Sequence, residues 1–257
     1  MKNPFGRDNG VSYTAWTIAG IVSLLLLWEC ASRFYGSFLI LPGPLPVLLR
    51  LASFVKTPRF LAALGGSFVR VLGGILIAVP LGMAAGIAAG LDRRINAFLS
   101  PFFSIVSAIP VMSVILIAFL FLGSGRTPVF TAFLMVFPVM AANTIEGIRS
   151  TDPKLKELFA AFRMSRSETL KYLYIPFLAP FMIGGLRSSL SLCWKVVAAA
   201  EVLVQPLRGL GTGMQQARAN LETPELFAWT AATVIAAAFS QGLLSLALKR
   251  FGIGGKQ

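Results

Sequence analysis

The chain has 257 residues, of which 56% are hydrophobic and only 13% are charged. Roughly a quarter of the residues of an ordinary soluble domain are charged, so this composition excludes a water-soluble globular protein and indicates a membrane protein. The formal net charge is +13, but the basic residues avoid the long apolar runs and are not interleaved with aromatic residues, which favours membrane topology over nucleic-acid binding.

Apolar runs of about 20 residues are long enough to cross a membrane as helices. Such runs predict six spans, at 12–32, 63–90, 98–121, 128–148, 177–204 and 225–248. The first follows Lys2 and Arg7 without a small-residue cleavage site, so we expect a retained anchor rather than a signal peptide. No repeat or linker divides the chain, and residues 1–257 are therefore predicted to form one all-α transmembrane domain.

The basic residues also predict the orientation of the spans. With the N-terminus in the cytoplasm, about twice as many Lys and Arg residues fall on the cytoplasmic side as on the other side, so both termini are predicted to be cytoplasmic. The loop 33–62 would then lie outside, with an amphipathic stretch at 47–55 resting at the outer interface. Cys30 and Cys193 both lie in apolar runs, which argues against a disulfide.

Small residues recur along the second predicted span. Gly82, Gly86 and Gly90 are four residues apart, a spacing that lets two helices approach closely. Packing against another helix of the same subunit is favoured over a seam between two subunits.

The segment 149–176, between the fourth and fifth predicted spans, is charged and forms helices. Asp152 and Pro153 predict a helix start, and Leu155, Leu158, Phe159 and Phe162 follow on one apolar face. Ser165 and Glu168 have the spacing of a capping box for a second helix, and Pro176 interrupts the backbone hydrogen bonds near the membrane. The pattern predicts helix, turn and helix, and the apolar face needs either a partner protein or lipid headgroups to cover it.

This segment resembles the EAA loop of the permeases of bacterial ABC importers. Glu157 takes the place of the motif's glutamate, and Ile175-Pro176 takes the place of its hydrophobic-proline end, at the family's spacing. Leu158 and Phe159 replace the two alanines, although Ala160 and Ala161 follow, and Arg163 stands at the glycine position. A left-handed residue there would cost arginine roughly 1 kcal/mol relative to glycine.

The resemblance extends over approximately 28–250 and is closest to the branch that serves nitrate, taurine and other sulfonates, and pyrimidine precursors. The segments that carry it are Trp28-Glu29, Leu41-Pro42-Gly43-Pro44, Ser67-Phe68-Val69-Arg70, Ala108-Ile109-Pro110, Arg149 with Asp152-Pro153, Gly185-Leu186-Arg187, Ala200-Glu201 and Gly209-Leu210-Gly211. It implies a type I importer permease fold in the bacterial cytoplasmic (inner) membrane.

The resemblance also implies partners and a coupling site. Two permease subunits, expected to be identical copies, form the pathway, and two cytoplasmic ATPases that bind ATP and Mg supply the energy. An extracytoplasmic binding protein delivers the solute, which is expected to be anionic or heterocyclic. The residues implied in ATPase coupling are Glu157, Leu158, Phe159, Ala160, Ala161, Phe162, Arg163, Met164, Ser165 and Arg166.

Polar residues inside the spans indicate a candidate pathway. Arg187, Ser191 and Lys195 share one helical face beside Trp194, and a charge inside a membrane is expensive enough to suggest function. The alternatives for Lys195 are snorkelling to the interface and an ion pair with Glu201 or Glu29, and the alternative for Arg187 is a local pairing or an anchoring role near the inner interface. Pro110, Met112 and Ser113 interrupt the third span and are candidates for the pathway lining, although Met112 also suits a packed core. Arg70 and Glu201 are predicted to be pairing residues.

Two other classes of protein fit less well. An ion-coupled secondary transporter would show intramembrane acidic relays or inverted repeats, and neither is visible. With no histidine in the chain and no acidic metal cluster, a membrane-embedded hydrolase is weaker still. We therefore expect a transport subunit that is not itself an enzyme, and that binds no metal.

Overall fold

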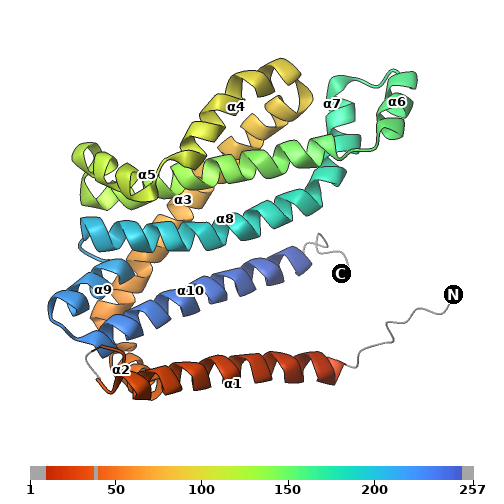
Figure 1. Ribbon diagram of the computed structural model, residues 1–257. Coiled ribbons are helices and arrows are strands. Elements are labelled where there is room, and N and C mark those ends of the chain that lie inside the picture. Colours follow the sequence, from red (N-terminus) through yellow and green to blue (C-terminus); the bar gives the residue numbers. More distant parts are fainter. Residues whose placement is uncertain (1–9, 38–39, 251–257) are drawn as a thin grey trace.

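The computed structural model describes residues 10–37 and 40–250, and throughout these ranges the regular secondary structure is helical. The helices are α1 (Gly10–Tyr35), α2 (Pro44–Phe54), α3 (Pro58–Leu91), α4 (Arg93–Ala108), α5 (Val111–Arg149), α6 (Pro153–Ala161), α7 (Arg166–Glu168), the π-helix η1 (Thr169–Tyr174), α8 (Ile175–Val204), α9 (Leu210–Ala219) and α10 (Thr223–Arg250). In Figure 1, α1, α8, α10 and the second part of α5 run along one common direction, and α3 crosses behind them. The predicted all-α fold is confirmed.

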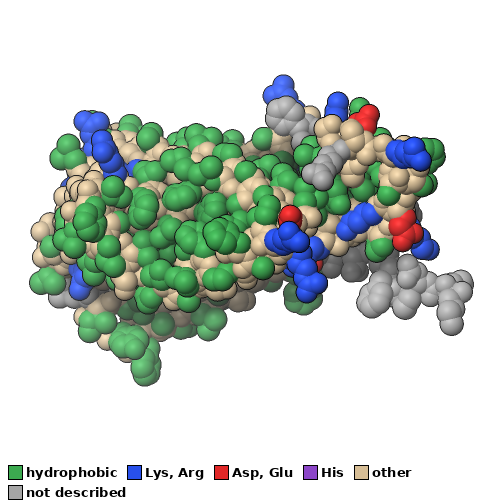
Figure 2. Space-filling model, turned by 90° about the horizontal axis from the view of Figure 1, so that it is seen from above, with side chains coloured by type: hydrophobic (Ala, Val, Ile, Leu, Met, Phe, Trp, Pro, Cys, Tyr) green, Lys and Arg blue, Asp and Glu red, His purple; other side chains and the backbone are tan. Residues whose placement is uncertain are grey.

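Five helical segments of the described ranges are long and apolar enough to cross a membrane, namely Thr14–Tyr35, Pro58–Leu91, Val111–Arg149, Thr169–Val204 and Thr223–Arg250. They account for the predicted spans at 12–32, 63–90, 128–148, 177–204 and 225–248. Figure 2 shows the matching surface, a wide zone of hydrophobic side chains with Lys and Arg gathered towards its two ends.

The predicted span at 98–121 is wrong as a single helix. Residues 98–108 belong to α4, residues 111–121 belong to α5, and Ile109 between them has the extended conformation φ −69°, ψ 129°. Pro110 explains the break, because its ring disfavours a helical conformation for the preceding residue and it has no N–H to donate.

Helix α5 is itself bent at Gly123. This residue has φ 66° and ψ 176°, a conformation open essentially only to glycine, and it separates a first part, 111–122, from a longer second part, 124–149. The bend allows the first part to pack against the end of α8, where Ile115 forms a buried cluster with Ala200 and Val204.

The core lies where α3, α5 and α8 meet. Its fully buried members come from all three helices and include Ala78, Val136, Met140, Cys193 and Val197. Cys193 is therefore sealed in the core while Cys30 is exposed on α1, and both are free thiols, as predicted.

The glycine row of α3 packs against α5 of the same chain. A Cβ added at Gly82 would lie 2.7 Å from the Cβ of Met140, and one at Gly86 would lie 2.5 Å from the Cβ of Thr144. At Gly90 the added Cβ would lie 2.7 Å from Cδ1 of Ile148. The prediction of close packing inside one subunit is confirmed.

Gly86→Ala is expected to lower the free energy of unfolding by about 1–3 kcal/mol, because the new methyl group overlaps Thr144 and forces the two helices apart. Gly65→Ala in the same helix is the matched control. No atom lies within 4 Å of its added Cβ, so its stability should stay level or rise by up to about 1 kcal/mol. Unfolding of the detergent-solubilised protein would measure both, and equal losses would contradict the packing.

Candidate functional site

The loop 149–176, called the coupling loop below, projects from one end of the molecule. In Figure 1, α6 and α7 stand beyond the helix ends there, and the first turn of α1 and the last turn of α10 lie at the same end. Asp152 Oδ1 accepts a hydrogen bond of 2.9 Å from the backbone N–H of Lys154, and Pro153 occupies the first turn. The predicted start of α6 is confirmed.

Helix α6 ends in a left-handed turn at Arg163. The residue has φ 50°, and its N–H donates to the carbonyl of Ala160 at 3.0 Å. The N–H of Met164 donates to the carbonyl of Phe159 at 3.2 Å, which completes a Schellman motif. Glycine is the usual residue at such a position, so this chain places an arginine where the backbone conformation favours a glycine.

Arg163→Gly is expected to stabilise the turn by about 0.5–1 kcal/mol, because relief of the left-handed strain outweighs the extra freedom of the unfolded glycine. The N–H groups of Arg163 and Met164 should then exchange about two to five times more slowly with D₂O. Arg163→Val should speed their exchange, since a β-branched residue is the least suited to positive φ. Faster exchange in the glycine variant would contradict the assignment.

A capping box starts the second helix of the coupling loop, as predicted. The backbone N–H of Ser165 donates to Glu168 Oε2 at 2.8 Å, and the N–H of Glu168 donates to Ser165 Oγ at 3.3 Å. The side-chain and backbone hydrogen bonds from Ser165 lower the pKa of Glu168. The cap is therefore fully formed above the ordinary pKa of a glutamate and is lost as the pH falls through the lowered value.

We expect the N–H of Ser165, whose hydrogen bond the Glu168 carboxylate accepts, to lose its protection from hydrogen exchange as the pH falls below the ordinary pKa of a glutamate, after correction for the intrinsic pH dependence of exchange. In Glu168→Gln, which has no carboxylate at this position, the same N–H should exchange faster already at neutral pH. An unchanged corrected rate across this range would show that the carboxylate does not hold the cap.

The π-helix η1 joins the coupling loop to α8 and was not predicted from the sequence. Its wide turn spans Thr169–Tyr174 and ends two residues before Pro176, which cannot donate a backbone hydrogen bond. A proline close to a helix start is the one local signal of such a change in winding. Lys156 of α6 lies 6.0 Å from the ring centre of Tyr174, a contact between the two halves of the loop.

The apolar side chains of α6 and of Phe162, which caps its C-terminus, are largely uncovered. Phe162 is 74% exposed and Leu158 is 48% exposed, while Phe159 and Leu155 are half-buried. No residue of α6 is buried. The other predicted coupling residues also lie at the surface: Glu157, Ala160, Ala161, Arg163 and Ser165 are exposed, Met164 is half-buried, and the side chain of Arg166 lies outside the described part of the structure.

Three of the predicted pathway residues share one outward face of α8. Arg187 and Lys195 are exposed and Ser191 is half-buried between them. Lys195 forms no ion pair within the described residues, because Glu201 is bound by Arg70 and Glu29 by Arg33. The alternative of a Lys195 ion pair is therefore wrong.

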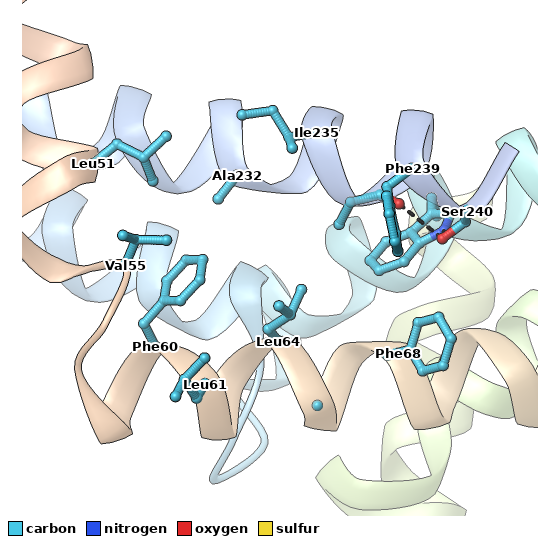
Figure 3. A pocket seen from close by; sticks show the side chains of 13 residues that line it. Leu51, Val55, Phe60, Leu61, Leu64, Phe68, Ala232, Ile235, Phe239 and Ser240 are labelled. Atoms are coloured by element: carbon cyan, nitrogen blue, oxygen red, sulfur yellow. Dashed lines mark hydrogen bonds between the residues drawn. The ribbon is translucent and has the colours of Figure 1, made fainter. Parts of the chain in front are cut away.

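Trp194 does not belong to this face. It is 2% exposed, and its indole N–H donates to Ser240 Oγ of α10 at 3.2 Å. It forms one wall of an apolar groove of about 480 Å³ between α3 and α10, shown in Figure 3 with Phe60, Phe68 and Phe239 around it. Trp194 therefore points towards α10 and away from the face of Lys195, since successive helical positions point about 100° apart.

The start of α5 packs against the last turns of α8, which follow Lys195. Val111 and Ala199 pack around the buried cluster of Ile115, Ala200 and Val204. Pro110, Met112 and Ser113 are exposed, and Met112 is 54% exposed, so the alternative that it fills the core is wrong. The structure thus brings the second half of the third predicted span against the end of α8.

A buried ionic cluster ties α3 to α8 and α9 at the end opposite the coupling loop. Glu201 is fully buried, and Arg70 Nη1 donates to its Oε1 at 2.8 Å. Ser67 Oγ donates to Glu201 at 2.7 Å, and the N–H of Gly211 donates to it at 3.1 Å. The predicted pairing roles of Arg70 and Glu201 are confirmed, whereas Ser67 was missed because a serine in an apolar helix carries no signal of its own.

Comparison with known proteins finds one matching family and several related transport permeases. The family described as "Binding-protein-dependent transport system inner membrane component" matches residues 78–251. The bicarbonate transport system permease protein CmpB of Synechococcus elongatus is 30% identical over 76% of this chain and 73% of its own length. The taurine transport system permease protein TauC of Escherichia coli is 28% identical over 91% of this chain and 86% of its own length, in agreement with the predicted branch.

A solved structure supports the fold. A chain of the MetNI methionine ABC transporter, in an inward-facing conformation, superposes with a TM-score of 0.56 and 16% sequence identity. The match covers 81% of this chain and 98% of the other. Because the sequence identity is low, this likeness concerns the helical architecture alone.

Proposed function

This chain belongs to the family of binding-protein-dependent transport system inner membrane components, and on that premise we propose that it is the permease subunit of an ATP-driven importer. The family and its relatives are transport permease subunits and not enzymes, and the chain is a multi-pass membrane protein.

The chain crosses the bacterial inner membrane six times. Helix α4 and the first part of α5 together form a crossing that is broken at Pro110, and the other crossings are α1, α3, the second part of α5, α8 and α10. The coupling loop is cytoplasmic, as are both termini, since the basic residues favour that side.

The exposed apolar residues of α6 and its C-cap carry the proposal. Leu158 and Phe162 stand on a helix that is capped at both ends and projects beyond the membrane-crossing helices. A rigid helix with uncovered apolar side chains fits a groove on a partner protein. The proposed partner is a cytoplasmic ATPase that binds ATP and Mg, and its movements reach α8 through the π-helix η1.

The remaining partners follow from the same family. We assign the pathway to the interface of two copies of this chain, lined by Arg187, Ser191 and Lys195 of α8 and by Pro110, Met112 and Ser113. An extracytoplasmic binding protein delivers the solute. The relatives are named for bicarbonate and taurine, and the exposed cations of α8 favour a small anionic solute over a heterocyclic one.

Reconstitution distinguishes this proposal from an ion-coupled transporter. Proteoliposomes that contain the chain, its ATPase and its binding protein should take up labelled solute only when ATP is present on the ATPase side. A proton or sodium gradient without ATP should drive no uptake. Uptake by the chain alone under an ion gradient would overturn the proposal in favour of secondary transport.

A further inference from the structure

A second cationic feature lies at the end of the molecule opposite the coupling loop. It is an open cavity of about 630 Å³ where α3, α5 and the loop 205–209 between α8 and α9 meet. The charged residues among its lining are Arg70 and Arg208, and the rest of the lining is apolar or glycine. Arg126 lines an adjoining cavity of about 400 Å³ that shares Gly125 and Val129 with the first.

The arginines outnumber the acidic groups here. Arg70 uses only its Nη1, to bind Glu201 Oε1 and the carbonyl of Arg208, so its other guanidinium N–H groups are available. Within the described residues, the side chains of Arg126 and Arg208 have no hydrogen-bond or ion-pair partner. Glu201 neutralises one of these charges and leaves an excess of positive charge around the cavity.

The loop that presents Arg208 is held rigidly. A Cβ added at Gly66 would lie 2.5 Å from the carbonyl oxygen of Arg208, and one at Gly209 would lie 2.7 Å from the carboxylate carbon of Glu201. The N–H of Leu210 donates to Ser67 Oγ at 2.9 Å. Such close contacts fix the backbone and therefore the base of the Arg208 side chain, which lowers the entropy lost when it binds a ligand.

We propose that this cavity binds a small oxyanion before it enters the pathway. A guanidinium group offers paired N–H donors that match two oxygens of a carboxylate, sulfonate or nitrate group, and two such groups face one cavity here. The small glycine positions leave the α3 and α5 walls open to the ligand. This site rests on the proposed function and narrows it to one class of substrate, the monovalent oxyanions.

The test uses a thiol beside the site in the full-length protein in membranes. Leu207 is 93% exposed and lines the cavity, so Leu207→Cys with Cys30→Ser gives one reactive thiol, since Cys193 is buried. A negatively charged methanethiosulfonate reagent should label it faster than a positively charged one. Arg208→Gln should lower that rate ratio by about tenfold, since one charge about 6 Å away in water changes each rate by about threefold.

Competition then tests binding itself. At constant ionic strength, methanesulfonate should slow the labelling, and the uncharged dimethyl sulfone should not. Arg208→Lys should keep the charge effect, and Arg218→Gln, which removes an exposed arginine elsewhere at this end, should change neither measurement. Equal protection by both compounds, or full protection by methanesulfonate in Arg208→Gln, would overturn the proposal. The assay needs no ATPase and no transport, so its failure is distinct from failure of the proposed function.

Discussion

Replacing Leu158 and Phe162 together by alanine is expected to weaken the binding of the ATPase to this chain by about thirtyfold or more. Large apolar side chains that fill a partner's groove contribute about 2 kcal/mol or more when they are interface hot spots. Leu158 is 48% and Phe162 is 74% exposed in the isolated chain and neither belongs to the buried core, so their removal should leave the fold intact. Titration of the purified ATPase onto permease in lipid nanodiscs would measure the affinity.

Phe98→Ala is the matched control for this pair. Phe98 lies on α4 and is 82% exposed, comparable to Phe162, but it is outside the coupling loop. Its replacement should leave ATPase binding unchanged. If Phe98→Ala weakened binding as much as the double replacement, the apolar face of α6 would not be the specific contact.

The second large effect concerns the ionic cluster of Arg70 and Glu201. Arg70→Met should lower the free energy of unfolding by about 3–5 kcal/mol, because it leaves a fully buried carboxylate without its counter-charge. Removing both charges, in Arg70→Met with Glu201→Leu, should recover part of that loss. Thermal unfolding in detergent would measure the series.

Arg33→Gln provides the comparison for an exposed ion pair. Arg33 is bound to Glu29 at 2.7 Å, but its side chain is 80% exposed, so its loss should change stability by less than about 1 kcal/mol. A similar loss for Arg33 and Arg70 would mean that burial does not set the strength of the cluster.

The coupling loop could be predicted in detail because its signals are local. Asp152, Ser165 and Glu168 cap their helices through residues two or three positions away, so their spacing in the sequence already contains the geometry. The left-handed turn at Arg163 could be inferred only from the resemblance to a glycine position, since arginine itself gives no sign of positive φ.

The errors had two sources: breaks inside an apolar run, and packing between segments that are distant in the sequence. An apolar run shows that 98–121 suits a membrane, but the break at Pro110 and the bend at Gly123 decide how the chain crosses it. Helical spacing placed Trp194 near Lys195, and the position of α10 decided that the indole turns inward towards Ser240. Ser67 donates a hydrogen bond to Glu201, which lies 134 positions away in the sequence, so no local pattern indicates this contact.

Cross-linking from α6 tests the central claim most directly. Phe162→Cys, in a chain with Cys30→Ser, would be reacted with a short bifunctional reagent in membranes that contain the ATPase and the permease. We predict a product with the combined mass of this chain and the ATPase, absent when Phe98→Cys replaces Phe162→Cys. Labelling of Phe162→Cys without any link to the ATPase, in a complex that still hydrolyses ATP and transports its solute, would contradict the assignment of this loop as the coupling site.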